Sequence, residues 1–80
     1  MKSQANLVKH GIDFRSAQDL WADPRLLTVE SPTASEARFL GVGSIGSTVW
    51  TAIFTMRGDR IRIISVRRAR LQEVRLYEGQ

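Results

Sequence analysis

The feature that most restricts the fold of this chain is a run of uncharged residues from Phe39 to Met56. The run is 18 residues long, which is close to the shortest stretch that can cross a membrane as a helix. It nevertheless contains three glycines and five serines or threonines, and its apolar residues alternate and are rich in β-branched types. Alternation is typical of a strand, and clustered Gly and Ser are typical of a turn. We therefore predict two strands joined by a turn at residues 43–47, and no membrane span.

The flanking sequence completes a small α+β domain. Gly11 would end a first helix in the left-handed conformation, with Ala5 and Val8 facing inward, and Asp13 would cap a second helix. The expected helices cover residues 2–10, 14–22 and 68–78, and the expected strands cover residues 26–30, 36–42, 48–55 and 60–66. Because 80 residues suit one domain, residues 1–80 should form a single antiparallel sheet of about four strands, with two N-terminal helices and one C-terminal helix.

The composition excludes several kinds of site. The chain has no cysteine, so it cannot form a disulfide, a thiolate metal site or a thiol nucleophile. It has one histidine, which argues against a zinc or haem site built from several histidines. The first residues lack the apolar core of a signal peptide. We expect a protein of the cytoplasm that uses neither a metal nor a cofactor.

Positive charge is concentrated near the C-terminus. Twelve lysines and arginines against eight acidic residues give a formal net charge of +4. Residues 57–75 contain seven arginines and only two acidic residues. A guanidinium group binds phosphate through a planar fork of donors. The pattern favours a polyanionic partner, most simply nucleic acid, and a solvated charged face is the alternative.

Two motifs lie near opposite ends of the chain. Residues 6–14 follow the pattern N-x-x-K-H-G-[IV]-x-F, and residues 57–69 read RGDRIRIISVRRA, followed by Glu73 and Tyr77. In this order and spacing the motifs resemble the BrnT family of bacterial toxins. Residues 21–24 and 36–43 also fit the pattern of that family, so the resemblance extends over nearly the whole chain.

The resemblance implies a ribonuclease toxin of a type II toxin–antitoxin pair, with a fold similar to that of the RelE toxins and no metal in its reaction. It also implies a hetero-oligomer with a BrnA-like antitoxin, which blocks the toxin and carries a DNA-binding segment. Members of the family usually begin with a short strand, whereas this sequence begins inside the helix that carries the first motif. The loop at residues 31–35 also lacks a histidine that is often found there.

Cleavage of RNA through its 2′-hydroxyl needs a base, an acid and cations that stabilise the phosphorane. The candidates for catalysis are Lys9, His10, Arg62, Arg67, Glu73 and Tyr77. The candidates for binding the RNA phosphate are Arg60, Arg62, Ser65, Arg67 and Arg68. Histidine is the residue type that exchanges protons near neutral pH, which makes His10 a candidate acid or base.

Each candidate also has a structural alternative. Lys9 and His10 would interact favourably with the dipole at the end of their helix, and Ser65 would suit a turn or a cap. Glu73 would pair with an arginine such as Arg70, and Tyr77 would pack on the sheet. The rival function is a non-catalytic basic module that binds nucleic acid or an acidic protein partner, and composition does not separate it from a nuclease.

Overall fold

The computed structural model describes residues 2–31 and 37–80. The helical elements are α1 (Lys2–His10), α2 (Phe14–Ala17), the 3-10 helix η1 (Gln18–Ala22) and α3 (Leu71–Glu78). The strands are β1 (Leu27–Ser31), β2 (Arg38–Ile45), β3 (Thr48–Arg57) and β4 (Arg60–Arg68). The strands form one antiparallel sheet in the order β1-β2-β3-β4, which confirms the expected α+β fold. Part of the expected loop at residues 31–35, and the expected strand start at residue 36, lie outside the described residues.

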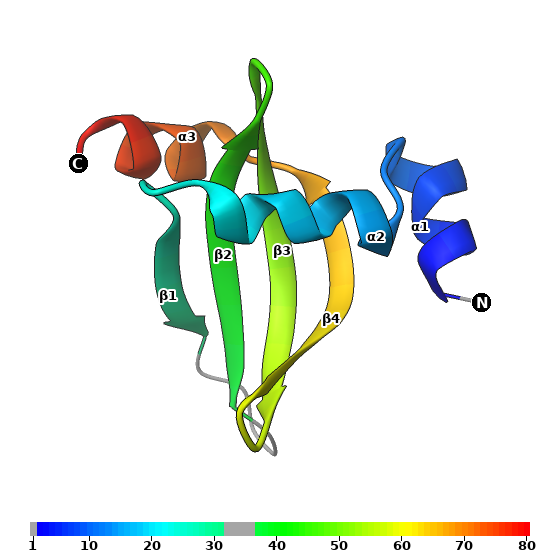
Figure 1. Cartoon of the computed structure of the whole chain (residues 1–80). Coiled ribbons are helices and arrows are strands. Elements are labelled where there is room, and N and C mark those ends of the chain that lie inside the picture. The colour runs from blue at the N-terminus through cyan, green and yellow to red at the C-terminus, as the bar shows by residue number, and fades with distance from the viewer. Residues whose placement is uncertain (1, 32–36) are drawn as a thin grey trace.

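The helices divide the two faces of the sheet between them (Figure 1). α2 and η1 run across one face, where Leu20, Trp50, Ala52 and Val66 form the core together with further residues of this layer. Side chains alternate along β3, so Thr51 points to the opposite face, where its hydroxyl bonds to Glu73 of α3. α3 covers only one end of that second face. The rest of it, which we call the open face, has no helix over it in the described part of the chain.

The turns follow from glycine positions and local packing. Gly46 and Gly58 have positive φ angles of 62° and 63° in the β2–β3 and β3–β4 turns, and Gly11 ends α1 at 82°. The first turn is shorter than expected, because β2 continues through residues 43–45. A Cβ on Gly43 would lie 3.1–3.3 Å from side-chain atoms of Leu26, Leu20 and Asp23, so this glycine serves close packing within the strand. The predicted turn at residues 43–47 therefore began too early, because it rested on the glycine content of that segment.

α1 docks through an amide group and not through apolar residues. Val8 is 89% exposed and Ala5 is also exposed, so the expected inward pair is wrong. Asn6 is the residue that α1 buries, at 6% exposed. Helical periodicity identifies one face of a helix, but here the docked face carries a polar residue whose partners lie far along the chain. α1 consequently lies beside the edge strand β4 (Figure 1).

Candidate nucleic-acid interface

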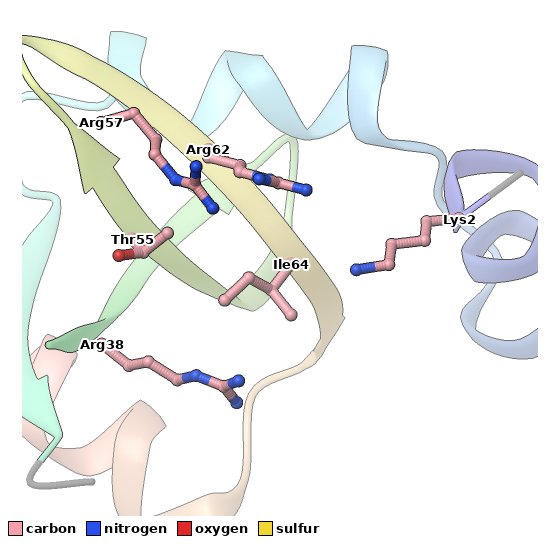
Figure 2. A pocket seen from close by; sticks show the side chains of 6 residues that line it. All are labelled: Lys2, Arg38, Thr55, Arg57, Arg62 and Ile64. Carbon is pink, nitrogen blue, oxygen red and sulfur yellow. The ribbon is translucent and has the colours of Figure 1, made fainter. Parts of the chain in front are cut away.

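A hollow on the open face gathers positive charge from four elements. It has a volume of about 130 Å³, smaller than the pockets that hold drug-sized ligands. Its lining residues are Lys2, Arg38, Thr55, Arg57, Arg62 and Ile64. We call it the basic basin. Figure 2 shows the four cationic side chains around Thr55 and Ile64. Within residues 2–31 and 37–80, four cations and no carboxylate line this space, which favours an anion as its occupant.

The register of the sheet explains why these arginines meet. Thr55 and Arg57 are two residues apart on β3, so their side chains share a face. Arg62 of β4 lies opposite Thr55 in the ladder and therefore joins the same face. The Thr55 hydroxyl donates to the carbonyl of Ala37, 2.9 Å away, next to Arg38 at the start of β2. Three antiparallel strands thus bring three guanidinium groups around one threonine.

The cations of the basin are exposed and carry no acidic partner among the described residues. The one ion pair within the described segments joins Arg67 and Glu73, which lie outside the basin. Holding several like charges together without counter-charges opposes folding, so such a cluster needs another reason to exist. Binding of a polyanion supplies that reason, because the anion neutralises the cluster.

A second hollow adjoins the basin and contains three of the residues expected from the sequence. It has a volume of about 240 Å³ and shares Lys2 and Ile64 with the basin. Its other lining residues are Ala5, Asn6, Lys9, His10 and Ser65. We call it the α1 hollow. Lys9, His10 and Ser65 are thereby placed next to the space that Arg62 lines, which joins the two sequence motifs in one region.

Asn6 fixes the wall of this hollow by bonding to the edge of the sheet. Its Oδ1 accepts the backbone N–H of Val66 at 2.9 Å, and its Nδ2 donates to the carbonyls of Val66 and Ile12 at 2.8 and 2.7 Å. The side-chain amide thus pairs with β4 as a peptide group of a neighbouring strand would. The Ser65 hydroxyl adds a longer contact of 3.4 Å to Oδ1. Asn6 holds α1, and with it Lys2, Lys9 and His10, against β4.

Glu73 and Arg67 form an anchor for α3. The Glu73 carboxylate accepts hydrogen bonds from both terminal nitrogens of Arg67, at 2.8 and 2.9 Å. It also accepts hydrogen bonds from the Thr51 hydroxyl at 2.9 Å and from the backbone N–H of Arg70 at 2.7 Å. We call these four residues the α3 anchor. The hydrogen bonds from Arg67 are the largest cause that lowers the pKa of Glu73 to about 2, and they raise the pKa of Arg67. Glu73 therefore stays ionised at neutral pH with both oxygens engaged.

Tyr77 points to a different polar cluster. It is 7% exposed, and its hydroxyl donates to Asp23 and lies 3.2 Å from the Ser44 hydroxyl. The Tyr77 hydroxyl is the first cause that lowers the pKa of Asp23 to about 2, followed by the backbone N–H groups of Ser44 and Arg25. Although Glu73 and Tyr77 are one helical turn apart, they bond to separate groups. The cluster ties α3 to β2 and to the end of η1.

The remaining expected arginines lie apart from one another. The guanidinium of Arg68 lies 5.8 Å from the ring centre of Trp50, a residue of the core layer. Arg60 lies opposite Arg57 at the β3–β4 turn, close to the basin. Of the expected phosphate ligands, Arg62 and Ser65 line the adjoining hollows, and Arg67 belongs to the α3 anchor.

Sequence reasoning did not single out three cations of the basin as site residues. Arg57 follows from the alternation on strand 48–55 once that strand is extended by two residues, and Arg38 already lies within the expected strand 36–42. Lys2 has no such signal, because its place depends on how Asn6 docks α1. The density of arginines pointed to this part of the chain, although it did not say which of them lack an acidic partner among the described residues.

Comparison with known families addresses the identity of the chain. Residues 1–73 match the family described as ribonuclease toxin, BrnT, of type II toxin–antitoxin system. The chain belongs to the BrnT family. The match confirms the resemblance that the two motifs indicated. A toxin of a type II toxin–antitoxin system has a protein antitoxin as its partner. No curated protein matches the chain.

The BrnT chain shows two further properties within residues 2–31 and 37–80. No helix there is long and apolar enough to cross a membrane. No group of three or more His, Asp or Glu side chains there is arranged to hold a metal ion. The uncharged run of residues 39–56 lies in β2, in β3 and in the turn between them.

Proposed function

We propose that this BrnT chain is an endoribonuclease that cleaves RNA without a metal, by attack of a 2′-hydroxyl on the adjacent phosphate. The observation that carries the proposal is the basic basin, where Lys2, Arg38, Arg57 and Arg62 surround a small space with no carboxylate among the described residues that line it. Cations fixed in such a position stabilise the charge that develops on a pentacoordinate phosphorane. The 2′-hydroxyl of the substrate is the nucleophile, so the protein need not form a covalent intermediate.

The adjoining hollows divide the work in this proposal. Arg57 and Arg62 hold the scissile phosphate, and Arg60 extends the positive surface toward the turn. Lys9 and His10 in the α1 hollow exchange the protons of the 2′-hydroxyl and of the leaving oxygen, and the Ser65 hydroxyl bonds to the phosphate. His10 is partly exposed there, which leaves it accessible to a substrate.

Arg67, Glu73 and Tyr77 serve this proposal through the position of α3. Arg67 and Glu73 bond to each other in the α3 anchor, and the Tyr77 hydroxyl donates to Asp23. Neither the Glu73 oxygens nor the Tyr77 hydroxyl faces the basin lining. Arg68, which lies over Trp50, is a more distant phosphate ligand.

The partner in this proposal is a BrnA-like antitoxin with a DNA-binding segment, which forms a hetero-oligomer with the toxin and stops its activity in the cytoplasm. An antitoxin that covers the basin with acidic residues would compete directly with RNA, because both ligands would neutralise the same cations.

The test is cleavage of single-stranded RNA by the purified chain in excess chelator, compared with the same sequence carrying 2′-O-methyl groups. We expect cleavage of the RNA only, with cyclic phosphate ends. Arg57→Ala and Arg62→Ala should each lower the rate about 100-fold, the scale seen when a transition-state donor is removed. Arg75→Ala is the matched control, because Arg75 is an exposed arginine of α3 that lines none of these hollows.

Three outcomes would overturn the proposal. Cleavage that requires added metal would remove the metal-free mechanism. Equal loss in Arg57→Ala and Arg75→Ala would remove the basin as the site. RNA binding by the folded wild-type chain without any cleavage would establish the non-catalytic binding module instead.

A further inference from the structure

A β-bulge lies in β4 at the place where the basic basin meets the α1 hollow. β4 pairs residue by residue with β3 from Arg60 to Ile63 and again from Ser65 to Arg68, and the register shifts between these two segments. Ile64 is therefore the extra residue of β4. A bulge bends its strand and increases the local twist, and bulges are frequent beside active sites because they re-aim side chains.

The bulge decides which residues of β4 share a face. Arg62 lies opposite Thr55 and Ser65 lies opposite Ile53, and these two partners are two residues apart on β3. Arg62 and Ser65 therefore project from the same face, although they are three residues apart along β4. Residues three apart in a regular strand point to opposite faces, so a regular strand of this sequence would turn Ser65 away from Arg62.

Ile64 forms the wall that the two hollows share. It lines both the basic basin and the α1 hollow, and Figure 2 shows its side chain among the cations of the basin. Ser65, the next residue, also lines the α1 hollow. Neighbouring residues of a regular strand point to opposite faces, so their shared side is a result of the bulge.

The segment after the bulge is fixed by Asn6. The side-chain amide of Asn6 bonds to the carbonyl of Val66 at 2.8 Å and to its N–H at 2.9 Å, and it is buried. α1 carries Lys9 and His10, which exchange protons in the proposed reaction. Because α1 is bound directly after the bend, the bend sets where this pair lies relative to Arg62.

We propose that Ile64 is a positioning residue of the RNA site. Its insertion turns β4 so that a phosphate held at Arg62 lies beside Ser65 and beside the proton-exchanging pair of α1. The inference rests on the proposed nuclease function and adds that the rate depends on the spacing of the two hollows as well as on their charge. A misplacement of about 1 Å in a catalytic site lowers a rate by as much as about 100-fold.

The test is deletion of Ile64. The deletion leaves a regular ladder in which Arg62, Ile63 and Ser65 keep their partners on β3, so every arginine stays on its face. We expect kcat for RNA to fall about 100-fold, because the two groups of residues are no longer aligned. We expect KM to change less than about threefold, because the cations that bind the phosphate remain.

Two further variants separate position from stability. Ile64→Val keeps the extra residue, so it should lower kcat by no more than about threefold. Phe39→Leu alters a ring that stacks on Phe54 in the core layer, and Phe39 is not among the described residues that line either hollow. It should weaken folding and leave kcat unchanged at temperatures where it is folded. An unchanged kcat in the deletion variant would overturn the inference, as would an equal fall in Phe39→Leu.

A measurement on the unaltered chain covers the case in which the deletion variant does not fold. The probe is a dinucleotide with a 2′-O-methyl group beside its phosphate, which prevents cleavage. In nitrogen-15 NMR spectra we expect the amide signals of Arg62, Ser65 and His10 to shift along one curve with a single dissociation constant. Shifts at Arg62 alone, or no saturable shift, would overturn the inference. Joint shifts in a chain that never cleaves RNA would support the positioning role and refute the nuclease function.

Discussion

The basic basin and the α3 anchor both use exposed or half-buried arginines on the same face of the sheet, with opposite results. In the anchor, Arg67 meets the Glu73 carboxylate through two hydrogen bonds. In the basin, Arg57 and Arg62 have no acidic partner among the described residues. An arginine's contribution depends on what already neutralises it. Paired arginines hold the fold together, and unpaired arginines are available to a ligand.

Removing one arginine from each region tests this difference in stability most directly. Arg67→Ala should lower the free energy of unfolding by about 3 kcal/mol, because it leaves the half-buried Glu73 carboxylate without its partner. Arg57→Ala should change that free energy by less than about 0.5 kcal/mol, as surface substitutions do. Urea unfolding followed by circular dichroism measures both. Equal destabilisation by the two substitutions would remove the distinction between the regions.

Acid should weaken the α3 anchor. The pKa of Glu73 falls from its ordinary value of 4.5 to about 2 on folding. Its contribution to stability is therefore complete above pH 4.5 and is lost as the pH falls through about 2. Asp23 acts in the same direction, from 3.8 to about 2. The loss should be smaller than that of Arg67→Ala, because acid neutralises Glu73 but leaves its side chain in place.

Glu73→Gln provides the control for this pH dependence. A series of unfolding curves between pH 7 and pH 2 should be flatter for this variant, since the Glu73 part is gone and the parts of Asp23 and of Asp13, whose pKa the Ser16 N–H lowers, remain. An identical pH dependence in the variant and in the wild type would show that Glu73 is not the group that titrates.

Asn6 fixes α1 to the edge of the sheet, and Asn6→Ala should lower the free energy of unfolding by about 2 kcal/mol. The substitution leaves the backbone groups of Val66 and the carbonyl of Ile12 without a partner in a buried place. Val8→Ala, on the exposed side of the same helix, should change stability by only a few tenths of that amount. Thermal unfolding distinguishes the two, and a similar midpoint for both would refute the role given to Asn6.

The salt dependence of RNA binding tests the role of the arginines in the basic basin. If the unpaired arginines contact phosphates, the affinity for single-stranded RNA should fall with salt at a logarithmic slope of about −0.7 for each contact. Arg57→Ala should reduce that slope by about 0.7, and Arg75→Ala should leave it unchanged. Fluorescence anisotropy at several salt concentrations gives the slopes. A slope that Arg57→Ala does not alter would mean that the basin is not the phosphate site.

The sequence predicted most of the fold because local signals were strong where strands and caps depend on neighbouring residues. The alternation in residues 48–55, the Gly58 turn and the Asp13 cap are all present, and the Asp13 carboxylate accepts the N–H of Ser16 at 2.7 Å. The docking of α1 was missed because Asn6 acts on Val66, which lies 60 residues away. No periodicity within α1 contains that information.

The candidate site was less predictable for the same reason. Arginine density pointed to β4 and the residues around it, and the hairpin spacing placed Arg62 correctly on that strand. Which arginines have an acidic partner depends on where Glu73 lies, because this carboxylate engages Arg67, whereas Arg62 has no ion-pair partner among the described residues. That choice is made by tertiary contacts between α3 and β3, such as the bond from Thr51 to Glu73.

The substitution with the smallest expected effect on stability, Tyr77→Phe, tests whether Tyr77 acts in RNA cleavage or only in holding α3. Tyr77→Phe removes the hydroxyl that donates to Asp23 and keeps the buried ring, so we expect a loss of about 1 kcal/mol in stability. If Tyr77 acts only by holding α3, kcat for RNA should be unchanged at temperatures where the variant is folded. Ser44→Ala, which removes another hydroxyl of the same cluster, should then match it in both measurements. A fall in kcat of about 100-fold in Tyr77→Phe alone would instead make the tyrosine a proton donor, and would require α3 to turn its hydroxyl from Asp23 toward the substrate.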